Sequence, residues 1–162
     1  MIKDKVTKPE IKLVGLSVRT NNMNEIEPIT AKIGGLASKF QNQNIASQIS
    51  NRKNPGVTYA VYTEYDSDEH GDYTYFIGEE VSAFENVPLG CKQITIPDSQ
   101  YQKFTVGPDK MPMVVIQAWQ QIWKMTSEDL GGQRTYQADF EVYDQRATDP
   151  VNTILDIFIG VK

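Results

Sequence analysis

The segment RTYQADFEVYD at residues 134–144 decides the predicted fold, because its polar and apolar residues alternate. Successive side chains of a β-strand point to opposite faces of the sheet. One face of this strand would carry mostly apolar residues suited to a core, namely Tyr136, Ala138, Phe140 and Val142. The other face would combine polar groups with an aromatic ring, in Gln137, Asp139, Glu141 and Tyr143. The pattern therefore predicts a strand with one buried face and one face of mixed character.

The last predicted strand, ILDIFIGV at residues 154–161, alternates in the same way. Its apolar face would consist of Leu155, Ile157, Ile159 and Val161, and its other face of Asp156, Phe158 and Gly160. The polar stretch 144–153 would join the two strands into a hairpin. Two interpretations of the mixed faces are open at this point. They form the solvent side of a half-exposed sheet, or they form a groove floored by Glu141, Asp156 and Phe158.

The order of predicted elements repeats once along the chain. Each half would contain a strand region, a helix and a hairpin: residues 11–20, 28–40 and 58–83, then residues 91–106, 112–125 and 135–161. The two hairpins share short matches, Tyr65-Asp66 with Tyr143-Asp144 and Phe76-Ile77-Gly78 with Phe158-Ile159-Gly160. We therefore expect one α+β domain over residues 1–162, with halves at about 10–87 and 88–162 and helices against a mostly antiparallel sheet. The lysine-rich residues 1–9 are expected to be a flexible lead-in, and Gly34-Gly35 to mark close packing or a break in the first helix.

Composition excludes several classes of protein. The chain has 162 residues, a net charge of -5 and one cysteine, so it has no internal disulfide. It has neither an apolar run of the ~18 residues that a membrane helix needs nor a signal-like start, so the expected location is the cytoplasm. An acidic chain is also a poor general binder of nucleic acid. Residues 54–91 contain eight Asp or Glu residues and no Lys or Arg. They form either a solvated acidic hairpin or a negative field that attracts a cation.

Motifs for metal and nucleotide binding are missing, so no cofactor is expected. The run Asp66-x-Asp68-x-His70-Gly71 is similar to the start of a calcium loop, but Ile77 stands where the twelfth-position acid is needed. A single histidine and a single cysteine exclude zinc sites built from several of these residues. Nothing in the sequence orients His70 and Cys91 as a catalytic pair. Neither a phosphate-binding loop nor a dinucleotide-binding glycine motif occurs.

Five segments together resemble the gyrase-inhibitor-like effector-binding family, which also occurs as the ligand domain of AraC-type and multidrug-responsive transcription regulators. They are LVGLSVRTNN at 13–22, YAVYTEYDSDEHGDYTYFIGEEV at 59–81, IQAWQQIW at 116–123, RTYQADFEVYD at 134–144 and DIFIGVK at 156–162. The resemblance implies a pseudo-two-fold pair of β-α-β-β halves around a central ligand groove. It also implies amphipathic, often cationic, ligands and a stand-alone binding domain without its own DNA-reading part.

The resemblance and the internal repeat together give seven candidate ligand-binding residues, Tyr143 among them. The family's ligand-contacting glutamate corresponds to Glu141, and its acidic and aromatic pair in the last strand corresponds to Asp156 and Phe158. Trp119 matches a family aromatic position and is a candidate wall of the groove. Phe76 and Tyr65 are candidates as repeat partners of Phe158 and Tyr143. The family more often has a glutamate at the position of Asp156 and a tyrosine or tryptophan at that of Phe158. Leu36 stands where the family's first helix usually has a tryptophan.

Two classes of function follow for these residues. The first is a binding protein for amphipathic cations, which reports to a partner regulator or acts as a homodimer, with aromatic rings for contact area and a carboxylate for selectivity. The second is a small hydrolase of electrophilic natural products, with Glu141 as general base and Tyr143 as hydrogen-bond donor. A topoisomerase-binding module, as the family name suggests, is a further alternative.

Overall fold

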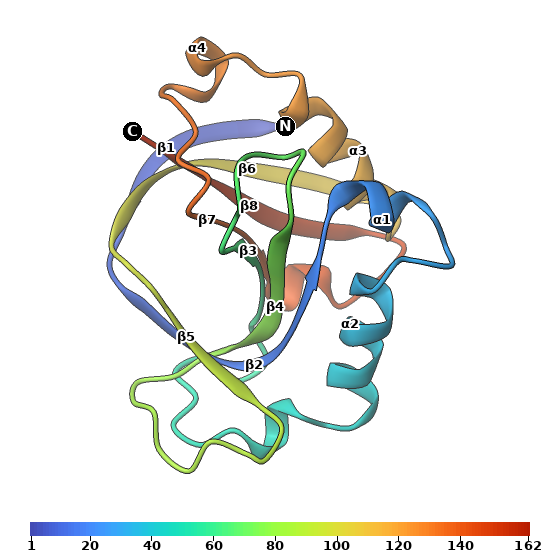
Figure 1. Cartoon of the computed structure of the whole chain (residues 1–162), viewed down its shortest axis with the longest axis vertical. Coiled ribbons are helices and arrows are strands. Elements are labelled where there is room, and N and C mark those ends of the chain that lie inside the picture. The colour runs from blue at the N-terminus through green and yellow to red at the C-terminus, as the bar shows by residue number, and fades with distance from the viewer.

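One antiparallel sheet of eight strands organises the computed structural model, which describes residues 1–162 (Figure 1). The strands lie in the order β1-β6-β8-β7-β3-β4-β2-β5. Their bounds are β1 Ile2–Lys8, β2 Ile11–Thr20, β3 Thr58–Thr63, β4 Tyr73–Glu80, β5 Lys92–Ile96, β6 Ser99–Asp109, β7 Ala138–Tyr143 and β8 Thr153–Val161. The predicted α+β class and antiparallel sheet are confirmed.

Four α-helices and two short 3-10 helices accompany the sheet. They are α1 Asn22–Ile26, α2 Ile33–Asn42, α3 Met113–Trp123, α4 Ser127–Leu130, η1 Ala46–Gln48 and η2 Gln145–Ala147. Amphipathic α2 and α3 pack on the same face of the sheet, each over its own apolar cluster. None of the helices has the length and apolar character needed to cross a membrane.

The prediction of a flexible lead-in at residues 1–9 is wrong, because Ile2–Lys8 forms the edge strand β1 and pairs with β6. The ammonium groups of Lys3 and Lys5 also donate to the carbonyl oxygens of Asp129 and Gly131 beside α4, at 2.7 and 3.1 Å. Lysines are common on edge strands, where they discourage pairing with another chain. The same composition therefore suits an edge strand as well as a mobile segment.

The first helix does not begin near Pro28. The short helix α1 ends at Ile26, and α2 starts only at Ile33. The Glu25 carboxylate accepts hydrogen bonds from the backbone N–H groups of Lys32 and Ile33 and so satisfies donors at the start of α2. Gly34 and Gly35 therefore lie in the first turn, and a Cβ added at either glycine would meet nothing within 4 Å. The expected close packing at these two glycines is not present.

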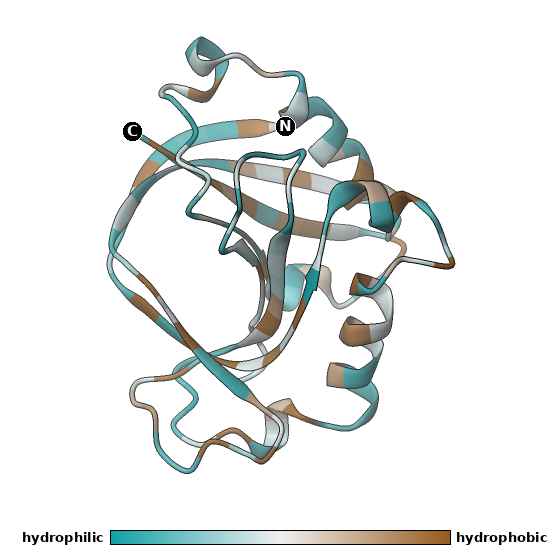
Figure 2. Ribbon diagram, viewed as in Figure 1, coloured by the Kyte–Doolittle hydropathy of each residue, from teal (hydrophilic) through white to brown (hydrophobic).

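The sheet has two buried faces with different neighbours. On one face, a cluster rich in aromatic rings fills the inside of the curled sheet; it includes Tyr59, Phe76, Tyr101, Phe140 and Phe158. On the other face lie the clusters under α2 and under α3. Figure 2 shows hydrophobic and hydrophilic residues alternating along the strands. Tyr62 and Tyr143 contact both helix-side clusters, so these two tyrosines mark the junction of the two halves.

Two glycines allow the paired strands β2 and β4 to approach each other closely. Gly15 and Gly78 are direct register partners. A Cβ on Gly15 would lie 1.9 Å from the carbonyl oxygen of Ile77, and one on Gly78 would lie 2.2 Å from that of Val14. Any side chain at either position would force the two strands apart. This close approach explains why a glycine stands at position 78, in the Phe76-Ile77-Gly78 match of the first hairpin.

Candidate functional site

A buried carboxylate lies at the centre of the sheet face that carries the helices. Glu141 is in the middle of β7, opposite Ala60 of β3 and Ile157 of β8, and is 2% exposed. One of its oxygens accepts hydrogen bonds from the Tyr62 hydroxyl at 2.8 Å and the Trp119 indole N–H at 2.7 Å. Its other oxygen accepts from the Tyr143 hydroxyl at 2.6 Å. Three elements, β3, α3 and β7, therefore hold this one carboxylate in place.

Aromatic rings surround the carboxylate, and we call them the aromatic cluster: Tyr62, Tyr73, Tyr75, Trp119 and Tyr143. Tyr62 is its centre, with ring centroids of Tyr73 and Tyr75 at 5.5 Å and of Trp119 at 5.1 Å. These contacts are mostly edge-to-face, a favourable geometry for aromatic pairs. Tyr62 and Tyr143 are only half-buried, so part of the cluster is open to a ligand.

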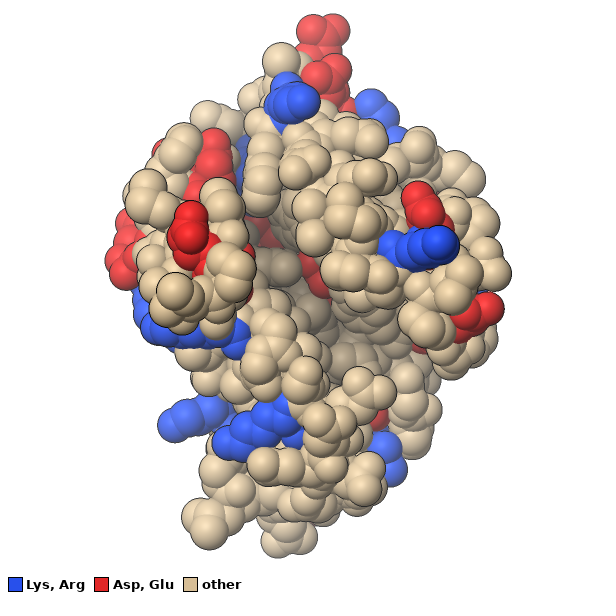
Figure 3. All heavy atoms as spheres, turned by 90° about the vertical axis from the view of Figure 1, so that its right-hand side faces the viewer, with Lys and Arg blue, Asp and Glu red and all other residues tan.

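One side of the molecule is hollowed. Figure 3 shows the side that carries α1 and α2, with a recess near its centre and acidic atoms deep inside it. The two helix-side clusters meet at Tyr62 and Tyr143 on this face of the sheet. The half-buried Tyr62 and Tyr143 therefore lie at the junction of these two clusters, directly beside the buried Glu141 carboxylate.

Every donor that reaches Glu141 is a neutral side chain, and none of the ion pairs in the structure includes it. Burial raises the pKa of Glu141, and the hydrogen bonds from Tyr143, Trp119 and Tyr62 oppose that rise only in part. Burial, together with the nearby Glu141, also raises the pKa of Tyr62 and Tyr143 well above the ordinary tyrosine value, so both hydroxyls stay protonated and donate. The ionised form of Glu141 therefore has no counter-charge in a site of low polarity.

The predicted grouping of Glu141 with Asp156 and Phe158 is wrong. Phe158 pairs with Phe140, one position away from Glu141, and therefore lies on the opposite face of the sheet. Its ring stacks on Phe140 at 4.7 Å, and the Lys8 ammonium lies 4.9 Å from the centroid of the Phe158 ring. Asp156 is bound by the Thr105 hydroxyl and the Arg146 guanidinium at 2.6 and 2.7 Å. Alternation in the sequence shows which side chains of one strand share a face. It does not show which face of the neighbouring strand lies on the same side of the sheet, because that depends on the pairing register.

The other sequence candidates divide between the two faces. Phe76 pairs with Val61 and is fully buried in the cluster inside the curled sheet, so it is remote from Glu141. Trp119 and Tyr143 contact Glu141 directly, as described above. Tyr65 lies at the edge of the aromatic cluster, with its ring centroid 5.8 Å from that of Tyr73. Its hydroxyl donates to Asp139 at 2.7 Å.

Three members of the aromatic cluster were missed at the level of sequence: Tyr62, Tyr73 and Tyr75. Each occupies the same sheet face as Glu141, because Tyr62 pairs with both Tyr75 and Asp139. The signal was present as tyrosines at alternate positions of the first hairpin, in TYAVYTEY and YTYFIG. Without the pairing of β3 with β7, these tyrosines could not be connected to Glu141.

The chain is similar to several known proteins. A protein of Bacillus subtilis strain 168 that carries the name transcriptional regulator protein YobU is 28% identical over 151 residues, which are 93% of this chain and 92% of that protein. The crystal structure of an integron cassette protein from Vibrio cholerae has a TM-score of 0.79 at 26% identity, over 99% of this chain and 95% of the other.

A third similarity concerns the fold alone. The structure of SAV2435 bound to tetraphenylphosphonium superposes with a TM-score of 0.75 at 19% identity, over 100% of this chain and 94% of that one.

The family profile described as integron-associated effector binding protein matches residues 6–161, which is nearly the whole chain. The chain therefore belongs to the family of integron-associated effector binding proteins.

Proposed function

We propose that the chain binds an amphipathic organic cation beside the aromatic cluster, with Glu141 as the counter-charge. The observation that carries this proposal is a buried carboxylate that receives three neutral donors and no cation. Burying an unpaired charge is costly, and an incoming cation offsets that cost. A neutral ligand gains nothing from this feature, so the site selects for positive charge.

The aromatic cluster suits the remainder of such a ligand. Ring faces attract a cation by about 0.5–2 kcal/mol per good contact, and the rings also provide apolar contact area. SAV2435, which has the same fold, is bound to tetraphenylphosphonium, a lipophilic cation. The name of YobU supports a regulatory setting. We propose that the chain reports the presence of its ligand to a partner regulator in the cytoplasm, in the manner of gyrase-inhibitor-like and AraC-type effector domains.

The geometry favours binding over hydrolysis by Glu141 and Tyr143. A general base must reach a water molecule or substrate proton within hydrogen-bond distance. Both oxygens of Glu141 already accept hydrogen bonds from the protein, and the residue is 2% exposed. The carboxylate is therefore arranged to stay ionised beside a bound charge rather than to accept a proton during a reaction.

The affinity for tetraphenylphosphonium should rise with pH until Glu141 is ionised and should then level off. The ligand carries a permanent charge, so only the protein titrates. Since burial raises the pKa of Glu141 in the free protein, protonation at acidic pH removes the counter-charge. Below that raised pKa, we expect about a tenfold loss of affinity per pH unit, because each complex must release one proton. Calorimetric titration between about pH 4 and 8 measures this slope.

The Glu141→Gln variant is the control for this titration, because it cannot titrate at that position. Its weaker binding should show no such slope. This separates Glu141 from the other buried acids on this sheet face, namely Asp139, which is paired with Arg134, and Glu79, which is paired with Arg52. An equal slope in the variant and the wild-type protein, or a flat profile in both, would exclude Glu141 as the counter-charge.

A further inference from the structure

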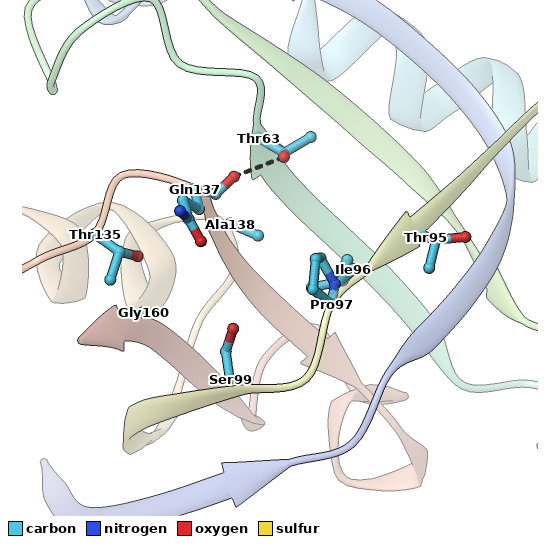
Figure 4. A pocket seen from close by; sticks show the side chains of 9 residues that line it. All are labelled: Thr63, Thr95, Ile96, Pro97, Ser99, Thr135, Gln137, Ala138 and Gly160. Atoms are coloured by element: carbon cyan, nitrogen blue, oxygen red, sulfur yellow. Dashed lines mark hydrogen bonds between the residues drawn. The ribbon is translucent and has the colours of Figure 1, made fainter. Parts of the chain in front are cut away.

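A second cavity lies on the opposite side of the sheet from Glu141. It has a volume of about 230 Å³ and is lined by nine residues from the ends of five strands and the segments beside them: Thr63, Thr95, Ile96, Pro97, Ser99, Thr135, Gln137, Ala138 and Gly160 (Figure 4). Ala138 and Gly160 are on the same sheet face as Phe140 and Phe158, whereas Glu141 faces the helices. The central strands thus separate this cavity from the aromatic cluster.

The chemistry of the lining is neutral and rich in hydroxyl groups. None of the nine residues carries an ionisable side chain. Buried Ile96, Ala138 and Gly160 form an apolar base, and the rest of the wall consists of Pro97 and five polar side chains. In Figure 4, the Ser99 hydroxyl and the Gln137 side chain point toward the same space, with Thr135 beside them. An apolar base with a few convergent polar groups is typical of a small-molecule site.

The Thr135 hydroxyl and the Gln137 amide are free to bind a ligand. The Thr63 hydroxyl is already used, because it donates to the carbonyl oxygen of Gln137 at 2.7 Å. No side-chain hydrogen bond within the protein involves the Thr135 hydroxyl or the Gln137 amide, whereas the Ser99 hydroxyl is within hydrogen-bond reach of the Tyr101 hydroxyl and keeps its remaining capacity for a ligand. A hydroxyl both donates and accepts, and a glutamine amide does the same through separate atoms. Their natural complement is a molecule that carries several hydroxyl groups of its own.

The absence of a side chain at Gly160 keeps this space open. A Cβ at that position would lie 2.7 Å from the Thr135 hydroxyl and 3.0 Å from the carbonyl oxygen of Ala138. The cavity is far larger than the ~10–15 Å³ that one water requires, yet smaller than the ~300–1,000 Å³ of sites for drug-sized ligands. Its size therefore suits a compact molecule.

We propose that this cavity is a second binding site, for a neutral polyol of about monosaccharide size. An ion there would be desolvated without a partner, so charged sugars should be rejected. Hydrogen bonds from Ser99, Thr135 and Gln137 orient the hydroxyl groups of the ligand, while Ile96 and Pro97 contact its carbon skeleton. The site is independent of the cation site at Glu141.

Titration of the ¹⁵N-labelled full chain with glucose and with myo-inositol tests this site by the shifts of its backbone amide signals. At least one of the two polyols should give saturable shifts of Ser99, Gln137 and Gly160 with a dissociation constant in the millimolar range, a few kcal/mol of binding free energy. Gluconate and glucosamine, which are charged, should give none. If neither polyol gives saturable shifts at these residues, or if the charged sugars bind equally well, the proposal fails.

A matched pair of exposed glutamines provides the control. Gln137→Leu removes an amide that lines the cavity, whereas Gln100→Leu makes the same change on β6 outside the lining. The first change should weaken polyol binding roughly tenfold through lost hydrogen bonds, and the second should leave it unaltered. Equal effects of the two changes would overturn the assignment. Both variants should bind tetraphenylphosphonium like the wild-type protein, whether or not the cation proposal itself is correct.

Discussion

The Glu141→Gln variant should lose affinity for tetraphenylphosphonium by about 30-fold or more while it remains folded. Removing one member of a buried charge pair costs about 2–5 kcal/mol of binding free energy, and 2 kcal/mol corresponds to about 30-fold. Glutamine keeps the size of the side chain and a carbonyl acceptor for Tyr62, Trp119 or Tyr143. Calorimetric titration at neutral pH measures the loss, and circular dichroism confirms that the variant is folded.

Asp156→Asn is the matched control, because it makes the same acid-to-amide change on the neighbouring strand. Asp156 pairs with Val142 across the β7–β8 ladder and lies on the opposite sheet face from Glu141. Its partners are Thr105 and Arg146, and neither contacts the aromatic cluster. Cation affinity should therefore change by less than about twofold. If Asp156→Asn weakened binding as much as Glu141→Gln, the charge effect would be long-range rather than due to contact with Glu141.

The Asp139→Asn variant should lose about 3–5 kcal/mol of unfolding free energy, the largest stability effect that we expect. Asp139 is fully buried and accepts three hydrogen bonds: from Arg134 at 2.7 Å, from the Tyr65 hydroxyl at 2.7 Å and from the backbone N–H of Gly160 at 2.8 Å. The Arg134 side chain is only 10% exposed, so neutralising its partner leaves a buried guanidinium unpaired. Urea denaturation gives the difference in unfolding free energy.

A double variant, Arg134→Met with Asp139→Leu, separates the ion pair from other roles of Asp139. Replacing both charges by apolar side chains of similar size removes the unpaired ion, so much of the lost stability should return. The Tyr65 hydroxyl and the Gly160 amide lose their acceptor in this variant, so the recovery should be incomplete. A loss below about 1 kcal/mol for Asp139→Asn alone would show that the pair contributes little to stability.

The sequence was sufficient for the fold class and for the central residue of the candidate site. Alternation in residues 134–144 placed Asp139, Glu141 and Tyr143 on one face, as the pairing of β7 confirms. The hairpins and the helix near residues 112–125 could also be predicted, because their apolar periodicity is regular. Strand β1 could not, since its alternating lysines pack against no core and are held by backbone pairing with β6.

Which residues share the site with Glu141 depends on the pairing register of β7 with β3 and β8. Local sequence does not determine that register. Glu141 lies opposite Ile157, so Phe158 and Asp156 lie on the other side of the sheet. A shift of one residue would have reversed this result, because strand side chains alternate with period two. For the same reason, Tyr62 and Tyr75 became visible as neighbours of Glu141 only once β4, β3 and β7 were placed side by side.

A crystal structure of the complex with tetraphenylphosphonium tests the central claim most directly, because it shows which face of the sheet holds the cation. We predict that the phosphonium centre lies beside the aromatic cluster on the helix side of the sheet, within about 6 Å of the rings of Tyr62 and Trp119 and next to the Glu141 carboxylate. A ligand bound on the Phe158 side of the sheet, or one that leaves Glu141 without contact, would contradict the claim.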